Sequence, residues 1–301
     1  MSRGQANLLL LLAAAFWGFG NVAQKTVLDH LDPLSAAGLR CLLASVVIAP
    51  LIIAERATGP VRGWWTSLLR VGALFIVGLS IQQISYLGTT VTNASFLVNT
   101  ATVMTPLAAW FMLREAPSAN VVLAASMTLA GALLLSDGLS GSISTGDYVA
   151  ILSAACYALW MVELGRHLKA HGRPITTSAA QFLSAAVILV PLGALYGNLS
   201  PSAAWKAGPE LAMLGIFSTA AAFGLQSVAQ RFTPASHAAV MVSAECVFGA
   251  AGAALLLGER VSPIGAVGGM LVFAAIVYLA ASGTGRSPLP GNSRGARLIG
   301  S

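Results

Sequence analysis

The sequence has few charged residues. Asp, Glu, Lys and Arg make up 9% of its 301 residues, whereas soluble domains carry roughly 25%. A chain with so little charge cannot cover a surface that faces water on all sides, so an ordinary soluble domain is excluded. Hydrophobic residues account for 56% of the chain, and its mean hydropathy is +0.80. We therefore predict an integral membrane protein that contacts the lipid bilayer.

Motifs that carry catalysis or hold cofactors are missing as well. The chain contains no Gly-x-Ser-x-Gly, His-Glu-x-x-His or Gly-x-Gly-x-x-Gly sequence and no phosphate-binding loop. Its four histidines are scattered, with His167 and His171 in an expected link between spans, and its three cysteines lie in apolar runs without metal-ligand spacing. We predict no enzymatic activity, no cofactor and no metal site.

The alternation of apolar and polar residues that marks membrane β-barrels is also missing. The apolar residues form continuous runs of about 20, the length that a helix needs to cross the hydrocarbon core. The predicted fold class is all-α, with ten transmembrane helices. The expected spans are 7–27, 34–54, 67–87, 92–112, 118–137, 147–166, 177–197, 209–229, 236–257 and 263–282.

The first apolar run has features of a secretory signal, since Arg3 precedes leucines at 8–12 and small residues at 13–15. Its apolar character continues to Val27, however, and a copy of it occurs in the middle of the chain, where no signal could lie. We therefore expect this run to be retained as the first span.

The copy establishes an internal repeat. The stretch Leu11–Lys25 corresponds to Leu152–Glu163, and downstream positions such as Pro33 and Pro174 match at a separation of 141 residues. Each copy holds five spans, an odd number, so the second copy enters the membrane from the opposite side. Inverted repeats of this kind are typical of secondary transporters, whose substrate site lies between the repeats.

The repeat divides the chain into two units and a tail. We expect the first five-helix repeat at 1–138, the second at 139–282, and a disordered cytoplasmic tail at 283–301. The separation between equivalent positions of the two copies is larger toward the end of each copy, where Glu115 and its counterpart Glu259 are 144 residues apart. We interpret this difference as local asymmetry between the repeats.

Lys and Arg are distributed unevenly between the two sides of the membrane. If the N-terminus is cytoplasmic, twelve of them fall on cytoplasmic segments, and only Lys206 and Arg260 fall on the opposite side. This bias predicts that both termini are cytoplasmic. The basic residues therefore act as topology signals, and we expect no nucleic acid as a partner.

Four ionisable residues lie within or at the ends of spans, where a charge is costly unless it faces a cavity or a partner. We expect Glu163 and Glu245, which are deep in their spans, to face a cavity. Lys25 and Arg40 lie near the outer ends of their spans, and their side chains could instead extend toward water.

Candidate substrate-binding residues share helix faces with these charges. Trp17, Asn21 and Lys25 recur every four residues, and Tyr157, Trp160 and Glu163 every three. We expect aromatic rings to contact apolar substrate groups, amides to orient the substrate, carboxylates to hold an ammonium group or exchange a proton, and Lys25 to steer a carboxylate. Interfacial anchoring and helix–helix bonding are the alternative roles. The full set is Trp17, Asn21, Lys25, Gln83, Tyr86, Asn99, Tyr157, Trp160, Glu163, Gln226 and Glu245.

Four stretches carry a family resemblance: Ala-Ala-Ala-Phe-Trp-Gly-Phe-Gly-Asn at 13–21, Asp-Pro-Leu-Ser-Ala-Ala-Gly-Leu-Arg at 32–40, Gly-Asp-Tyr-Val-Ala-Ile-Leu-Ser-Ala-Ala-Cys-Tyr-Ala at 146–158, and Leu-Leu-Leu-Gly-Glu-Arg-Val-Ser at 255–262. In their order and repetition, the chain resembles EamA-type members of the drug/metabolite transporter superfamily.

The resemblance implies a ten-helix carrier of the bacterial inner membrane that exports small metabolites, and it is greatest for aromatic and neutral amino-acid exporters. Proton-coupled efflux of drugs or organic cations is the alternative. A Glu-Pro pair is common in the ninth span of this family, but this chain has Glu245-Cys246 there. Whether that span is broken therefore stays open at this point.

Overall fold

The computed structural model describes residues 1–55, 62–136, 144–258 and 260–282. Within these ranges the chain is helical and contains no strand. By length and composition, nine of the helices described there can cross a membrane, and α6 (Ala119–Leu135) adds a shorter apolar helix. Its 17 residues still suffice for a span. The expected ten-span, all-α fold is confirmed.

The helical segments follow one another along the chain with short links. Their bounds are α1 (Arg3–Thr26), η1 (Val27–Asp29), α2 (Pro33–Ala54), α3 (Trp64–Ser85), α4 (Val91–Asn99), α5 (Ala101–Leu113), α6 (Ala119–Leu135), α7 (Thr145–His171), α8 (Pro174–Tyr196), α9 (Pro201–Lys206), α10 (Gly208–Ala212), η2 (Met213–Ala221), α11 (Ala222–Gln230), α12 (Ala235–Val242), α13 (Glu245–Leu257) and α14 (Pro263–Ser282).

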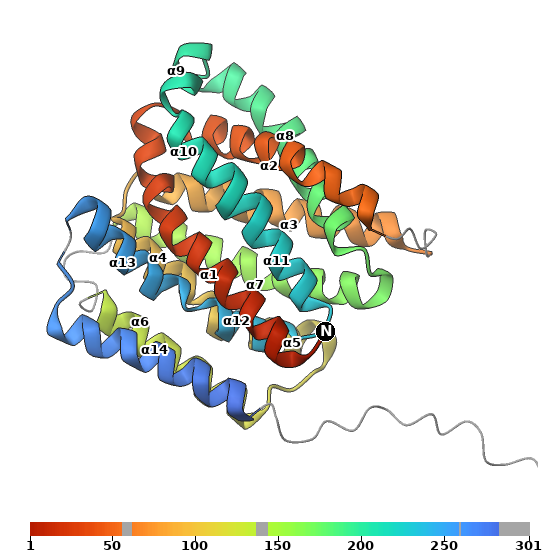
Figure 1. Ribbon diagram of the computed structural model, residues 1–301, viewed down its shortest axis with the longest axis vertical. Helices are drawn as coiled ribbons and strands as arrows, with labels where there is room; N and C mark the ends of the chain where they lie inside the picture. The colour runs from red at the N-terminus through yellow and green to blue at the C-terminus, as the bar shows by residue number, and fades with distance from the viewer. Residues whose placement is uncertain (56–61, 137–143, 259, 283–301) are drawn as a thin grey trace, which may run out of the picture.

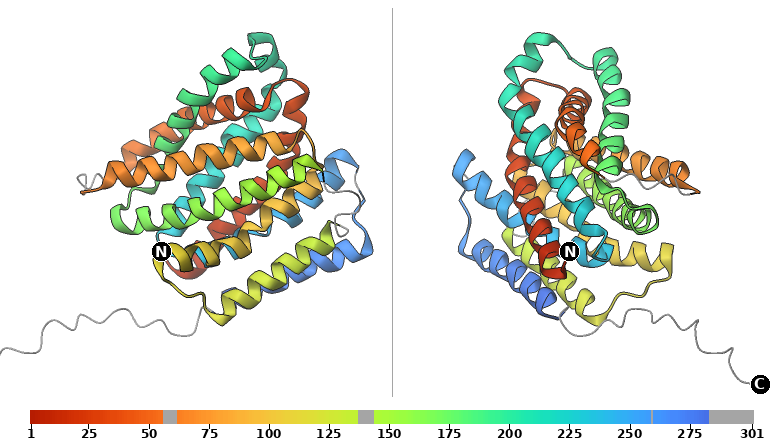
Figure 2. Two further views of the ribbon diagram at one scale, coloured as in Figure 1. Left: turned by 180° about the vertical axis from the view of Figure 1, so that it is seen from behind. Right: turned by 45° about the vertical axis from the view of Figure 1, so that its right-hand side comes forward.

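The spans alternate in direction, so the links lie at two ends of the bundle. The start of α1, the α5–α6 link and the α7–α8 turn lie at one end, called here the proximal end (Figure 2, left). The α8–α9 connection and the end of α13 lie at the other, called the distal end. Many helices begin at a side chain that accepts a backbone N–H bond, the usual role of Ser, Thr and Asp at an N-cap. These caps are Ser2, Asp32, Thr90, Ser118, Ser144 and Ser200.

Helices of one repeat pack against helices of the other. The most extensive pairings are α2 with α8, α3 with α7, and α6 with α14 (Figure 1). In the numbering of spans these are 2 with 7, 3 with 6, and 5 with 10. The pairing of span 1 with span 8, through α1, η2 and α11, mirrors that of span 3 with span 6. Span 2 therefore packs against its repeat equivalent, span 7, and span 5 packs against span 10. The pair of spans 3 and 6 is likewise equivalent to the pair of spans 1 and 8. Both relations fit a pseudo-twofold axis between inverted repeats.

Three spans are interrupted near the middle, and one of them is span 9, whose break the sequence left open. Span 4 divides into α4 and α5 at Thr100, six residues before Pro106. Span 9 divides into α12 and α13 at Ser243 and Ala244, although no proline is present there. Span 8 contains the π-helical segment η2 between α10 and α11. Interrupted helices in corresponding positions of two repeats commonly mark a transporter's binding site.

Other expectations about the helices need correction. The sixth span continues beyond 166 to His171, so His167 and His171 belong to the last turns of α7 and not to a link. The distal helix α9 was not expected. Glu259, the 138/139 boundary and the tail from 283 lie outside the described residues.

Candidate functional site

A cavity lies between the two repeats, at the level where spans 4 and 9 are broken. Helices of both repeats line it: α1 to α5 from the first, and α7, α11, α12 and α13 from the second. Its wall is formed by Trp17, Gln24, Arg40, Gln82, Val98, Asn99, Ala101, Thr102, Tyr157, Trp160, Met161, Phe223, Gln226, Ala239, Val242 and Glu245.

Arg40 supplies a positive charge to this wall. Its side chain is 1% exposed, and its Nε donates to Thr219 Oγ1 at 2.8 Å. The Nη2 group donates to Ser218 Oγ at 3.1 Å, and the Nη1 group to Gln24 Oε1 at 3.0 Å. A guanidinium carries five N–H donors. Three of them are therefore used by these bonds, and the others can serve a ligand in the cavity.

Glu245 supplies a negative charge to the same wall. A chain of amides on α1 connects it to Arg40: Gln24 Nε2 donates to Asn21 Oδ1 at 2.7 Å, and Asn21 Nδ2 donates to Glu245 Oε1 at 2.9 Å. Asn21 Nδ2 also lies 3.0 Å from Ser95 Oγ, which belongs to α4. The two charges are thus fixed by amide side chains and do not form a direct ion pair.

A hydrogen bond connects the point where span 4 is broken to the point where span 9 is broken. Asn99, the last residue of α4, donates from Nδ2 to the carbonyl oxygen of Ser243 at 2.9 Å. Ser243 lies between α12 and α13, and Glu245 is the first residue of α13. A helix N-terminus carries a partial positive charge that stabilises a carboxylate nearby. The break therefore places the Glu245 carboxyl group at the cavity, beside the N-terminus of α13.

Aromatic rings form the remaining large surface of the cavity. The Phe223 ring lies with its centroid 4.8 Å from that of Trp17 and 5.5 Å from that of Trp160. The polar atoms of two rings are bonded to amide side chains: Trp160 Nε1 donates to Gln181 Oε1 at 2.7 Å, and Tyr157 Oη donates to Gln82 Oε1 at 2.8 Å. These bonds fix the rings, whose faces remain available to an apolar group or a cation.

The structure brings together most of the residues that the sequence predicted as substrate ligands. Asn21 does not line the cavity, but it donates a hydrogen bond to Glu245, which does. Those that line the cavity are Trp17, Asn99, Tyr157, Trp160, Gln226 and Glu245. A role for them in substrate binding stays a prediction.

Three of the predicted ligands lie toward the distal end and do not line the cavity. Lys25 Nζ donates to the carbonyl oxygens of Tyr86, at 2.6 Å, and Thr89, at 3.0 Å. Gln83 Nε2 donates to the carbonyl oxygen of Gln24 at 2.8 Å, and the Tyr86 side chain is fully buried. Lys25 therefore joins the end of span 1 to the link after span 3 and does not steer a carboxylate in the cavity.

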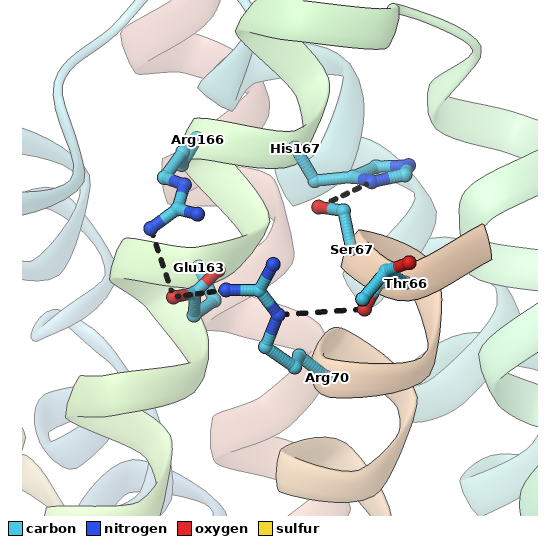
Figure 3. Close-up of polar contacts among 6 residues, drawn as sticks. All are labelled: Thr66, Ser67, Arg70, Glu163, Arg166 and His167. Carbon is cyan, nitrogen blue, oxygen red and sulfur yellow. Dashed lines mark hydrogen bonds and ion pairs between the residues drawn. The ribbon is translucent and has the colours of Figure 1, made fainter. Parts of the chain in front are cut away.

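Glu163 does not line the cavity either, which corrects the expectation that it continues the face of Tyr157 and Trp160. It lies six residues after Tyr157, about 9 Å farther toward the proximal end at 1.5 Å per residue. There its Oε1 lies 3.3 Å from Arg166 Nη1 and 3.9 Å from Nη1 of Arg70, a residue of α3 (Figure 3). Glu163 thus joins the two repeats through α3 and α7.

His167 adds a second polar contact between the same helices. Its Nδ1 lies 3.0 Å from Ser67 Oγ, and its side chain is fully buried (Figure 3). The rings of Trp64 and His167 are 4.7 Å apart, and the Arg173 guanidinium lies 5.4 Å from the Trp64 centroid. The proximal end of the α3–α7 pair is therefore closed by charged, polar and aromatic contacts.

The predicted set of substrate ligands did not include several residues of the cavity wall, among them Arg40, Gln24 and Phe223. Two signals for them were present. Gln24 lies three residues after Asn21, on the same helix face. Arg40 corresponds to polar Gln181 in the second repeat, and a polar residue at both equivalent positions indicates an interior site. Neither signal alone identifies a ligand.

The cavity can hold a small molecule that has both charges and an apolar part. Among the described residues, no three His, Cys, Asp or Glu side chains gather in a group that could bind a metal ion. The wall has instead one guanidinium, one carboxylate, several amides and four aromatic rings. Two inverted five-span repeats around a polar and aromatic cavity, with broken helices at its level, are an arrangement found in many secondary transporters.

The family is shown by comparison with known proteins. The EamA-like transporter family matches residues 4–137 and 144–281, so the chain belongs to this family and is a multi-pass membrane protein. An uncharacterized transporter of Archaeoglobus fulgidus is 24% identical over 93% of this chain and 87% of its own length. The uncharacterized transporter YwfM of Bacillus subtilis (strain 168) is 23% identical over 92% and 94%.

Two further known proteins are similar to this chain, one over part of its length and the other over nearly all of it. The threonine/homoserine exporter RhtA of Escherichia coli (strain K12) is 30% identical over 120 residues, which is 40% of each chain. A solved crystal structure superposes with a TM-score of 0.76 at 16% identity, over 95% of this chain and 100% of that one. The second similarity shows the fold alone.

Proposed function

We propose that this EamA-family transporter exports amino acids, aromatic and neutral ones included, by alternating access. The observation that carries the proposal is that Arg40 and Glu245 line the same cavity. An amino acid at neutral pH carries a carboxylate and an ammonium group. Arg40 would bind the carboxylate through its remaining N–H donors, and Glu245 would bind the ammonium group.

The aromatic surface supports the same substrate class. Trp17, Tyr157, Trp160 and Phe223 would contact the apolar part of the amino-acid side chain, and the burial of that part favours binding by about 25 cal/mol per Å². RhtA, which matches part of this chain, is named an exporter of threonine and homoserine. That name supports amino acids as the substrate class.

Efflux of organic cations is less favoured by the same cavity. Glu245 and the aromatic rings would suit a cation, but the guanidinium of Arg40 in the same wall would repel it. A zwitterion satisfies both charges and leaves neither buried without a partner.

The charge distribution supports an orientation in the bacterial inner membrane. At the proximal end, Arg3 starts α1, Arg114 follows α5, and Arg173 lies between α7 and α8; Arg70 and Arg166 lie beside Glu163 in the same region. Positive residues concentrate on the cytoplasmic side of membrane proteins. We therefore assign the proximal end, with both termini, to the cytoplasm.

The proposal is tested with purified protein in liposomes, by exchange of a labelled amino acid against three unlabelled competitors. One competitor is the same amino acid, the second is its amine without the α-carboxylate, and the third is its acid without the α-amino group. We expect competition by the amino acid alone. Arg40→Gln and Glu245→Gln should each lower kcat/KM by roughly 30-fold or more, because each leaves a buried charge of the substrate without its partner.

The matched control is Lys206→Gln, which removes a cation from the exposed helix α9, far from the cavity. It should leave exchange unchanged. Exchange of the amine with undiminished activity in Arg40→Gln would favour the cation extruder. No exchange of any amino acid by a correctly inserted protein would overturn the proposal.

A further inference from the structure

Gln226 differs from the other amides of the cavity wall. Its side chain is fully buried, yet neither Oε1 nor Nε2 has a hydrogen-bond partner among the described residues. Gln24 and Asn99 bond through both their oxygen and nitrogen atoms, and Gln82 accepts from Tyr157. Gln226 therefore presents a free donor and a free acceptor at the cavity wall.

The position of Gln226 shows which part of a ligand would meet it. It lies three residues after Phe223 on α11, so the two side chains share a helix face. The Phe223 ring contacts both Trp17 and Trp160. The free amide is thus placed beside the aromatic surface, where the proposed function puts the side chain of the amino acid.

We propose that Gln226 determines specificity within the amino acids by selecting side chains with a neutral hydrogen-bonding group, a hydroxyl or a carboxamide. The inference rests on the proposed function and names the substrate subclass of the same cavity. A hydroxyl or carboxamide both donates and accepts, so it satisfies both atoms of Gln226. A hydrocarbon side chain of the same shape would cover the amide without bonding to it, and a site with buried polar groups rejects such a ligand.

The residues of the cavity wall disfavour amino-acid substrates whose side chains are charged. Its two charges, Arg40 and Glu245, are matched by the α-carboxylate and the α-ammonium group of the substrate. A third charge would be buried against the aromatic rings without a counter-charge, at a large desolvation penalty. The selected group is therefore polar and uncharged.

The test compares pairs of amino acids that have nearly the same shape but differ in the polar group: threonine with valine, glutamine with methionine, and tyrosine with phenylalanine. Exchange is measured in liposomes containing the wild-type protein, with both members competing below saturation. In every pair that is transported, we expect kcat/KM to be higher for the polar member by roughly 10- to 100-fold. This comparison does not depend on the folding of any variant.

The variant Gln226→Met keeps the length of the side chain and removes its donor and acceptor. We expect it to abolish or reverse the preference within each pair. Gln230→Met is the matched control. Gln230 lies one turn farther along α11 and is fully buried, but it does not line the cavity, and its Nε2 donates to the carbonyl oxygen of Met161 at 3.3 Å. Gln230→Met should keep the wild-type preference.

The outcomes separate this inference from the proposed function. Exchange of amino acids with equal rates for threonine and valine, and for the other pairs, would overturn the role of Gln226 and leave amino-acid transport standing. Loss of the preference in Gln230→Met as well as in Gln226→Met would also overturn it. Absence of all amino-acid exchange would overturn the proposed function itself.

Discussion

Asp32 holds two helices at the distal end through one carboxylate. It caps α2 by accepting N–H bonds from Leu34 and Ser35, each at 3.0 Å. Its other oxygen accepts from the backbone N–H of Asn198, after α8, at 2.9 Å. The link is reciprocal, because Asn198 Oδ1 accepts from the backbone N–H of Asp32 at 2.7 Å. One residue thus stabilises the start of α2 and its contact with α8.

These bonds predict a pH dependence of stability. Partial burial raises the pKa of Asp32, but the hydrogen bonds from Ser35, Asn198 and Leu34 outweigh it and hold the pKa below its usual 3.8. A carboxyl whose folded-state pKa is depressed stabilises the folded state above the unfolded pKa, and this stabilisation is lost as the pH falls through the folded pKa. Thermal unfolding in detergent should therefore show less stability below about pH 4, and part of that loss should be absent in Asp32→Ala.

At neutral pH, Asp32→Ala should itself destabilise the protein by about 1 kcal/mol, the typical value of an N-cap. Asp29→Ala is the control, since Asp29 ends the short η1 segment and the structure gives it no bond to α2. Equal melting curves for Asp32→Ala and Asp29→Ala across this pH range would contradict the assignment.

Single residues show what a sequence can and cannot indicate about the cavity. Lys25 and Arg40 both lie near the ends of apolar runs, and the pattern could not separate them. The fold does so, because Arg40 meets Ser218 and Thr219 of the π-helical segment, whereas Lys25 meets the link after α3. These partners lie 61 to 179 residues away in the chain, so no local pattern contains them.

Among the elements, the α6–α14 pair depends on close approach of the backbones. A Cβ atom added at Gly131 would lie 2.6 Å from the carbonyl oxygen of Gly268 and 3.0 Å from the backbone nitrogen of Val272. Because both atoms belong to the backbone of the facing helix, they cannot yield as a side chain could. Small residues at such crossings are typical of membrane helix pairs.

Gly131→Ala should therefore destabilise the protein by about 1–3 kcal/mol, as overpacking does. Gly165→Ala is the control within α7, where the nearest atom to the added Cβ is Ala235 Cβ at 3.8 Å. Alanine is favoured over glycine in a helix by roughly 1 kcal/mol, so this control should be neutral or stabilising. Chemical unfolding in mixed micelles measures both changes, and a stabilising Gly131→Ala would contradict the packing.

The breaks of spans 4 and 9 mark the limit of prediction at the same scale. Apolar run length predicted that spans exist at 92–112 and 236–257, and both are present as pairs of helices. The break in span 9 needs no proline, because Asn99 of the other repeat donates to the carbonyl oxygen of Ser243. A break stabilised by a distant side chain leaves no local sequence signal.

In the whole molecule, the overall architecture was predictable because it is repeated in the sequence. Ten apolar runs and the repeat separation of 141 residues determine the number of spans and their inverted order. The contacts between repeats were not predictable, because they join residues that are unrelated by the repeat. Glu163 is the example: the helix period placed it toward the cavity, whereas the packing of α7 on α3 places it beside Arg70.

The Glu163–Arg70 pair joins the two repeats near the proximal end, where the proposed alternating access requires them to separate. Glu163→Gln keeps the shape and removes the charge, so the proximal end should open more often. Arg70 is 48% exposed, which limits the effect of the pair to about 1 kcal/mol and the gain in opening to roughly fivefold. The readout is the rate at which a membrane-impermeant maleimide labels Met161→Cys, with the native cysteines replaced by alanine.

Arg166→Gln separates this closure from a general loss of charge around Glu163. Arg166 is on the same helix as Glu163, three residues later, so its removal leaves the contact between α3 and α7 in place. Labelling should therefore rise in Glu163→Gln and in Arg70→Gln but stay near the parent rate in Arg166→Gln. Equal labelling in all three variants would show that the repeats are held together elsewhere. The buried His167–Ser67 contact, which joins the same two helices one turn away, would then be the next to remove.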